Sequence, residues 1–246
     1  MASKRQADRE TLELFRRNAE AAAVRVVEVA TFREAALFAV RLAGEKPAAP
    51  LLIPGLERPE GAGKTLFFSG LPERLFGEVS AAALQAGARA ARSGARAYAG
   101  ALDVGFSVAA LGIAETASLV LAHRDEDSRL ASMLPETHVA ALAASSMVTA
   151  LEEAAPFIER SLALPGSWTT LVSGCSRTSD IERVLVLGVH GPLELCVCLV
   201  MDEEDIGEAA DAGTGEAAGA AAGKAHGTAA GKAAGEARDT EGGRHG

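Results

Sequence analysis

The feature that most constrains the fold is a strand–helix–strand pattern in the first 53 residues. Residues 24–29 alternate β-branched and charged side chains, which is typical of a strand. Thr31 follows as an N-cap, Glu34 completes a capping box with it, and a helix is predicted to about residue 42. A short apolar strand over residues 51–53 closes the unit. This succession predicts an α/β fold with a largely parallel sheet.

The elements that follow extend this pattern to one domain over residues 1–206. Apolar spacing predicts further helices over 8–22, 72–94 and 146–160, and further strands over 118–121, 139–143, 168–172 and 193–201. The strand 193–201 is apolar at nearly every position. This predicts a central place in a sheet that is covered on both faces.

The end of the chain has a different composition. After residue 206 it consists mainly of Gly, Ala, Lys and Glu, with almost no large apolar side chain. Such a segment buries too little surface to offset the entropy lost on ordering. We therefore predict a disordered Gly/Ala-rich tail over residues 207–246.

Charge and hydropathy exclude two classes of partner. Ten acidic and four basic side chains lie from Asp202 onward, so the tail holds −6 of the net charge of −9 and the body is near neutral. A near-neutral body argues against nucleic-acid binding, which needs a clustered basic face. No apolar run approaches the ~20 residues of a membrane span, and the charged N-terminus does not resemble a signal peptide. We expect a cytoplasmic protein.

The three cysteines are too few for a disulfide framework and fit a reducing compartment. No Cys-x-x-Cys occurs, so we expect no iron–sulfur cluster on this chain alone. Cys196 and Cys198 lie two apart on one strand and are interpreted as small core residues. We therefore expect neither a metal site nor a cofactor bound by this chain alone.

Residues 61–65 (Gly-Ala-Gly-Lys-Thr) end like a phosphate-binding P-loop. That motif requires a further Gly five residues before Gly63, where this chain has Arg58. We interpret the segment as an ordinary surface loop.

The most polar motif comes directly after the predicted strand 168–172. Gly174 permits a sharp exit from that strand, and the backbone N–H groups that follow can form an anion-binding concavity. Ser176 and Thr178 offer hydroxyls, and Arg177 offers a planar fork for a carboxylate or phosphate. In the alternative interpretation Asp180 caps a short helix and Arg177 pairs with it or with Glu182.

Two other polar side chains stand next to predicted strands. Glu115 lies between apolar residues before the strand 118–121 and is either a functional carboxylate or one that binds backbone N–H groups. His138 introduces the strand 139–143 and is interpreted as a turn or strand-edge residue more readily than as a ligand.

Taken together, these segments resemble the LUD-domain family and, within it, its lactate-utilization branch. The resemblance covers about residues 10–201. It is carried by Ile113-Ala114-Glu115-Thr116-x-Ser118-Leu119-Val120, by Leu134-Pro135-x-x-His138-Val139, and by Gly174-x-Ser176-Arg177-Thr178-x-Asp180-Ile181-Glu182 with Gly188-Val189-His190-Gly191-Pro192.

The resemblance implies a three-layer α/β/α domain like that of ribose-5-phosphate isomerase, glucosamine-6-phosphate deaminase and the CoA transferases. It also implies a non-iron–sulfur component of a system that oxidises L-lactate to pyruvate, with iron–sulfur clusters on partner subunits. A small carboxylate or phosphorylated ligand would bind at the strand ends. Glu115 and His190 would form the acid–base pair. The predicted ligand-binding residues are Thr116, Ser118, Gly174, Ser176, Arg177, Thr178, Asp180 and Gly191.

Two positions depart from the family pattern. Ala117 stands where the family commonly has Gly, and Cys175 stands where it commonly has Pro, so the ligand of this chain can differ. Two other functions stay open: a stand-alone enzyme of the isomerase or CoA-transferase type with Glu115 as nucleophile or base, and a ligand-binding scaffold module without chemistry.

Overall fold

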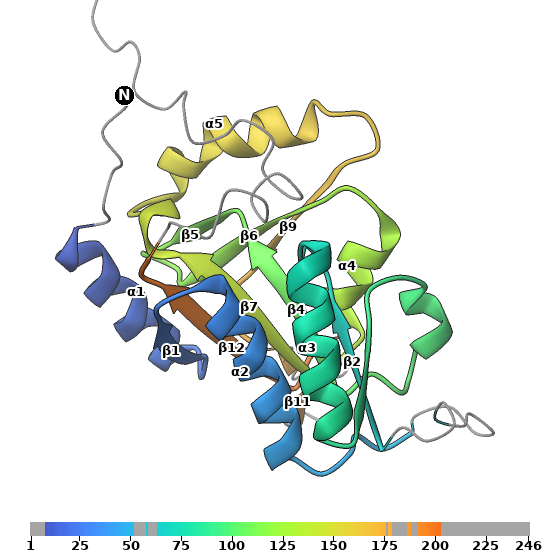
Figure 1. Ribbon diagram of the computed structural model, residues 1–246. Coiled ribbons are helices and arrows are strands. Elements are labelled where there is room, and N and C mark those ends of the chain that lie inside the picture. Colours follow the sequence, from blue (N-terminus) through green and yellow to red (C-terminus); the bar gives the residue numbers. More distant parts are fainter. Residues whose placement is uncertain are drawn as a thin grey trace, which may run out of the picture.

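A six-stranded sheet in which every neighbouring pair is parallel forms the centre of the computed structural model (Figure 1). The structure describes residues 8–51, 58, 63–175, 177–178, 186–187 and 191–202. The strand order is β1-β12-β7-β4-β2-β3. The strands are β1 (Arg25–Val29), β2 (Lys64–Phe68), β3 (Ala88–Ala91), β4 (Val104–Ala109), β7 (Thr137–Ala143) and β12 (Glu194–Val200).

Two central strands are buried on both faces. Every residue of β7 is buried, and so are six of the seven residues of β12. Their side chains alternate between two apolar clusters: Cys196 and Cys198 point to one face, Leu195 and Val197 to the other. The predicted central place of the last strand is confirmed, because β12 lies between β1 and β7.

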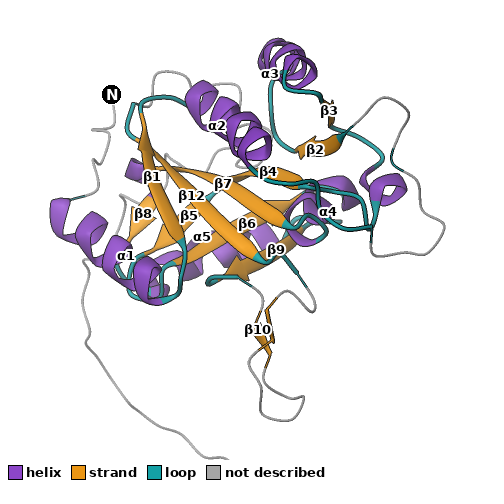
Figure 2. Cartoon of the chain, turned by 90° about the horizontal axis from the view of Figure 1, so that it is seen from below, coloured by secondary structure: helices purple, strands orange, loops and turns teal. Residues whose placement is uncertain are grey.

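Helices cover the first face of this sheet. Helix α2 (Phe32–Glu45) and helix α3 (Glu73–Gln85) pack on it (Figure 2). The predicted N-cap is present, because the Thr31 hydroxyl accepts a hydrogen bond from Glu34 N at 3.1 Å. The second half of the predicted capping box differs, since the Glu34 carboxylate accepts its hydrogen bond from Ala30 N, at 2.8 Å, in place of Thr31 N. The strand β1 and its capped helix therefore form as the sequence predicts.

The second face is covered by helix α1 (Arg9–Ala21) and by a four-stranded sheet of order β8-β5-β6-β9. Its strands are β5 (Leu111–Ile113), β6 (Ser118–His123), β8 (Met147–Val148) and β9 (Trp168–Val172). Helix α5 (Leu151–Leu162) packs on the outer side of this smaller sheet. The expected α/β class and largely parallel central sheet are confirmed, and the layer on this face contains strands as well as helices.

Shorter elements connect these layers. They are helix α4 (Glu126–Met133), the 3₁₀ turns η1 (Ala95–Tyr98) and η2 (Ala144–Ser146), and the paired strands β10 (Arg177–Thr178) and β11 (Val186–Leu187). Strands β10 and β11 pair only with each other among the described residues, and Figure 2 shows β10 apart from the two larger sheets.

Two predicted helix boundaries are wrong. The helix predicted over 72–94 ends at Gln85, because residues 88–91 pair with β2 as strand β3 despite their alanine content. The helix predicted from Ser146 begins at Leu151, after strand β8. Strands β2, β4 and β5 were not predicted. The strand predicted over 51–53 and the tail 207–246 lie outside the described residues, apart from Leu51, which is not in a strand.

The sheet has a topological switch point between β2 and β4. The chain leaves β2 through α3 toward the edge strand β3, whereas it leaves β4 toward β7 on the opposite side. In open parallel sheets, the loops that diverge at such a point leave a crevice at the carboxyl ends of the strands. The fold therefore places a candidate ligand site after Phe68 and near Ala109.

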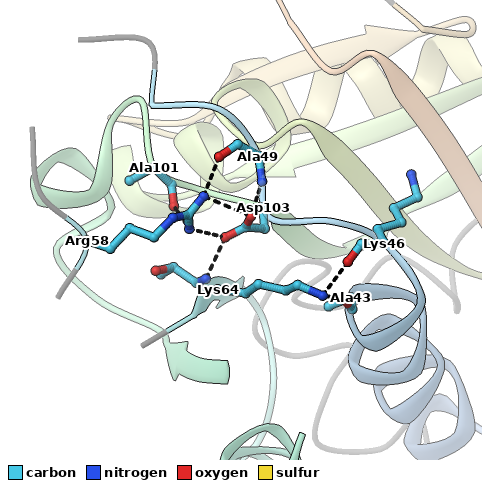
Figure 3. A network of polar contacts seen from close by, with 8 residues as sticks. Ala43, Lys46, Ala49, Arg58, Lys64, Ala101 and Asp103 are labelled. Carbon is cyan, nitrogen blue, oxygen red and sulfur yellow. Dashed lines mark hydrogen bonds and ion pairs between the residues drawn. The ribbon is translucent and has the colours of Figure 1, made fainter. Parts of the chain in front are cut away.

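The opposite end of the same two strands is held by a buried carboxylate. The Asp103 carboxylate, directly before β4, accepts hydrogen bonds at 2.6 Å from Ala49 N, Thr65 N and Arg58 Nη1 (Figure 3). The ion pair is largely buried, with the Asp103 side chain 5% exposed. Asp103 thereby joins β2, β4 and the segment after α2, and a buried charge with these partners is costly to disturb.

Lys64, the lysine of the P-loop-like segment 61–65, lies at the same end of the central sheet as Asp103. It begins a strand rather than a helix, and its Nζ donates hydrogen bonds to the carbonyl oxygens of Ala43 and Lys46 at the end of α2 (Figure 3). Cationic donors at a helix carboxyl terminus satisfy carbonyls that lack intrahelical partners.

None of the described helices is long and apolar enough to cross a membrane.

We predict that Asp103→Asn lowers the free energy of unfolding by about 3 kcal/mol, because it removes the charge that compensates buried Arg58 and turns one acceptor into a donor. Urea denaturation followed by circular dichroism measures this change. The matched control is Glu13→Gln in the exposed Arg9–Glu13 pair, with an expected loss below about 0.5 kcal/mol. Equal losses in the two variants would contradict a central role for Asp103.

Candidate functional site

The predicted site residue Glu115 lies in the turn between β5 and β6. Asn18 of helix α1 holds this turn, since its side-chain amide donates to the carbonyl oxygens of Ala114 and Glu115 at 2.9 Å each. The exposed Glu115 carboxylate accepts a hydrogen bond from Leu151 N at 2.7 Å, at the first residue of α5. This contact matches the alternative interpretation of Glu115 as a carboxylate that binds backbone N–H groups.

The next predicted residues form a chain of hydroxyls. Thr116 Oγ1 lies 2.7 Å from Ser118 Oγ, and Ser118 Oγ contacts Ser173 Oγ at the end of β9. Gly174 follows with a φ of +97°, and a Cβ atom there would lie 3.2 Å from the Ala22 carbonyl oxygen. The structure therefore brings Thr116, Ser118 and Gly174 together at one end of β6.

The rest of the predicted motif is only partly described. Ser176, Asp180 and His190 lie outside the described residues, and for Arg177 and Thr178 the structure gives the backbone as strand β10. Gly191 is half-buried before β12. An acid–base pair of Glu115 with His190, and a carboxylate site on Arg177, stay predictions.

One cavity among the described residues lies at the other end of β6, at the switch point of the central sheet. Its volume is about 130 Å³. Its walls come from the residues after β2, the end of β4, the end of β6 and the start of α4, namely Ser69, Gly70, Ser107, Val108, Leu121, Ala122, His123, Arg124, Asp125 and Ser128. Since β6 spans five residue steps from Ser118 to His123, roughly 17 Å separate the cavity from the hydroxyl chain.

A pair of buried histidines adjoins this cavity. His123 is 3% exposed, and its Nε2 has no hydrogen-bond partner among the described residues. His138 of β7 is 1% exposed; its Nε2 lies 2.5 Å from Ser107 Oγ, and its Nδ1 is likewise unpartnered in the described structure. The interpretation of His138 as a turn or strand-edge residue is wrong, because it lies in a central strand and faces the layer between the two sheets.

Both imidazoles are neutral at physiological pH. Burial is the main cause that lowers the pKa of His123 to about 4, with a further contribution from the Arg129 charge. Burial likewise lowers the pKa of His138 to about 3, with His123 as a second cause. Neutral imidazoles accept and donate hydrogen bonds, and they hold uncharged polar groups better than they transfer protons at pH 7.

Cys196 and Cys198 lie away from this cavity and face helix α2 in the first apolar cluster. Burial raises the pKa of Cys196 and of Cys198 to about 12, so their thiols stay protonated. Among the described residues no group of three or more His, Cys, Asp or Glu side chains is arranged to hold a metal ion.

Ser107 and His123 were not predicted as site residues. Each carried a weak signal, Ser107 as the lone hydroxyl in an apolar run and His123 as the polar residue that ends a strand. Only the pairing of β4 with β7 and the packing of the two sheets bring them to one place.

The chain is similar to known proteins in sequence and in fold. Residues 12–200 match the LUD domain family model. Lactate utilization protein C of Geobacillus thermodenitrificans is 34% identical over 103 residues, 41% of this chain and 43% of that protein. The protein of that name from Bacillus subtilis is 34% identical over 104 residues, and the one from Deinococcus radiodurans is 38% identical over 92 residues, each match covering 43% of the relative. The matches thus span less than half of these relatives.

A crystal structure of a DUF162 family protein from Deinococcus radiodurans is similar in fold. It superposes with a TM-score of 0.51 and 20% sequence identity, covering 78% of this chain and 96% of that one. At this identity the likeness supports the α/β architecture alone.

We predict that the free energy of unfolding decreases by on the order of 3 kcal/mol between pH 7 and pH 5. Both histidines have folded pKa values below the ordinary 6.5, so the unfolded chain binds protons there that the native state does not. This stability is present above pH 6.5 and is lost as the pH falls toward 4. Urea denaturation at the two pH values measures it.

His123→Gln and His138→Gln should each reduce this pH dependence, whatever their effect on stability at pH 7. A pH dependence that is equal in the wild type and both variants would show that the two imidazoles are not the source.

Ala117, which stands where the family commonly has Gly, allows a prediction about backbone strain. It has a φ of +49° and is buried, whereas Ala23 has a φ of +56° and is exposed. Ala23→Gly should stabilise the chain by about 0.5–1 kcal/mol, because glycine adopts this conformation without strain. Ala117→Gly should raise the free energy of unfolding by about 1 kcal/mol less than Ala23→Gly does, since it also loses a buried methyl group. Equal gains in urea denaturation would mean that the Ala117 methyl contributes nothing.

Proposed function

Since this chain belongs to the LUD domain family, we propose that it acts in the cytoplasm as a component of an L-lactate utilization system that oxidises lactate to pyruvate. In this proposal it binds a small carboxylate or phosphorylated ligand and carries no iron–sulfur cluster or other cofactor of its own. The clusters that take up the electrons belong to partner subunits.

The observation that carries this proposal is the family match over residues 12–200 together with relatives named lactate utilization protein C. The match includes every strand of the central sheet and the cavity at its switch point. What those names say of the relatives is extended to this chain as a hypothesis, since the matches cover less than half of each relative.

The chemistry of Cys196 and Cys198 supports the assignment of the iron–sulfur clusters to partner subunits. Cys196 and Cys198 point into the apolar cluster under α2, where their raised pKa values keep them protonated. Iron–sulfur clusters require deprotonated thiolates that are placed around a common centre. Electron transfer in the proposed system is therefore assigned to partners.

The cavity supports the binding of a small ligand. Its volume of about 130 Å³ suits a molecule of a few non-hydrogen atoms. Its lining combines apolar walls with serines, a histidine, an arginine and an aspartate, the composition of a small-molecule site. Arg177, with Ser176 and Thr178, stays a separate predicted carboxylate site in the 174–191 motif.

The geometry of Glu115 gives less support to a stand-alone enzyme. A carboxylate that accepts the first N–H group of α5 is held in place by the helix it caps. The acyl-transfer alternative would require this exposed carboxylate to leave that contact and attack a substrate.

Deletion of the gene for this chain should abolish growth of its host on L-lactate as sole carbon source and leave growth on pyruvate unchanged. Wild-type protein should restore growth, and Arg177→Ala should restore it poorly if Arg177 holds the carboxylate. Glu13→Gln, on an exposed helix surface, serves as the matched control. Undiminished growth of the deletion strain on lactate would refute the lactate role, whereas full complementation by Arg177→Ala would remove only the role of Arg177.

A further inference from the structure

We propose that a second copy of this chain pairs with β9, the open edge of the smaller sheet, so that the two β9 strands lie antiparallel about a two-fold axis at Thr170. The pairing joins the two four-stranded sheets into one continuous sheet. It goes beyond the proposed function, because it needs neither a ligand nor a role in lactate oxidation.

Strand β9 is the least protected edge of the two larger sheets, as far as the structure describes them. Of the other edge strands, β1 carries Arg25 and Glu28, β3 carries Arg89, and β8 is only two residues long. Charged side chains and short length are means by which proteins keep sheet edges from pairing. Strand β9 has five residues and none is charged, and Trp168 and Leu171 are 43% and 45% exposed. It therefore lacks the features that prevent pairing.

The backbone of β9 presents hydrogen-bonding groups at this edge. Val120, which stands opposite Leu171, accepts a hydrogen bond from Ala110 N at 2.9 Å, so its backbone groups point to β5 and away from β9. In an antiparallel pair the N–H and C=O groups of one residue point the same way, and successive residues alternate. The groups of Leu171 and, two residues earlier, of Thr169 therefore point away from β6. They have no hydrogen-bond partner among the described residues.

A second β9 satisfies these groups in one register. Thr169 of each copy stands opposite Leu171 of the other, and each such pair exchanges both of its N–H···O hydrogen bonds. Every outward-facing backbone group of the two residues thereby gains a partner. Because the two pairs are related by symmetry, the axis passes through Thr170 and the contact closes at two copies. This closure identifies a copy of the same strand as the occupant of the edge.

The side chains that this register brings together are compatible. Thr170 lies opposite Thr170 of the second copy, and Trp168 lies opposite Val172 of the second copy. Pairs of two threonines, and pairs of an aromatic with a β-branched residue, are favourable across strands. Since β9 has no charged side chain, no like charges of the two strands meet.

The outer face of β9 adds apolar surface to the contact. Thr169 Oγ1 donates a hydrogen bond to Ser161 Oγ of α5 at 3.0 Å, so Thr169 and, by alternation, Leu171 lie on the α5 face of the strand. In the dimer Leu171 lies beside Thr169 of the second copy, near the end of that copy's α5. Leu162, the last residue of α5, is 59% exposed in the single chain. Dimerisation therefore covers apolar side chains that one chain leaves in water.

Sedimentation velocity of the full-length chain over a concentration series tests the oligomeric state. A species of twice the 25.1 kDa of one chain should replace the monomer as the concentration rises. A monomer at every concentration up to about 100 μM would overturn the proposal.

A pair of matched variants tests the edge. Leu171→Lys should weaken dimerisation at least about tenfold, because it places a charge of the same sign on both copies at the contact. Leu151→Lys is the control: it changes the same residue type at the same exposed fraction of 45%, but close to β8, the opposite edge of the sheet. It should dimerise like the wild type. Equal dissociation constants of the two variants would show that the copies meet elsewhere and would overturn the proposal.

The fluorescence of Trp168 tests the contact in the wild-type protein, without any variant. Trp168 is the only tryptophan of the chain, and dimerisation covers its exposed indole. On dilution its emission should move to longer wavelength, with the same midpoint as dissociation in sedimentation. An emission maximum that stays constant through dissociation would place the interface away from β9 and overturn the proposal.

Cross-linking tests the register. Thr170→Cys places two thiols opposite each other at the axis, where cross-strand Cβ atoms lie about 4.5–5.5 Å apart, close to the reach of a disulfide. Oxidised glutathione should convert this variant to a disulfide-linked dimer on a non-reducing gel. The control Leu151→Cys, with the same native cysteines, should stay monomeric on that gel. Equal cross-linking of the two variants, or none, would overturn the two-fold pairing at Thr170.

Discussion

Burial of β7 and β12 on both faces is the constraint on which the rest of the structure depends. A parallel sheet has no solvent-facing side, so each of these strands needs an apolar layer above and below it. Helices α2 and α3 supply one layer, and α1 with the four-stranded sheet supplies the other. The small sheet is therefore part of the core, and its strand β6 is pressed against the carboxyl end of β4.

This second layer also brings polar groups into the interior. Ser107 and His138 point from the central sheet toward β6, and His123 ends β6 beside them. Burial keeps both imidazoles neutral and leaves one ring nitrogen of each without a partner in the described structure. Buried polar groups with incomplete hydrogen bonding are uncommon in stable cores.

Elements with a local physical cause were predictable. The N-cap at Thr31 and the continuous apolar run of β12 act within a few residues, so the sequence shows them directly. Strand β3 was misread because Ala88–Ala91 favours a helix in isolation and becomes a strand only by pairing with β2. Glu115 was correctly singled out as a polar residue at a strand entrance, but its contact with Leu151 depends on where α5 begins.

By itself the sequence determined the α/β class, the parallel sheet and the membership of the LUD domain family, because periodicity, caps and motif spacing are properties of neighbouring residues. Only the tertiary structure decided which polar residues share a site. Ser107, His123 and His138 lie on three different strands, and they meet because β4 pairs with β7 while β6 packs across both. Contacts between distant segments are set by sheet order and packing, which no local pattern encodes.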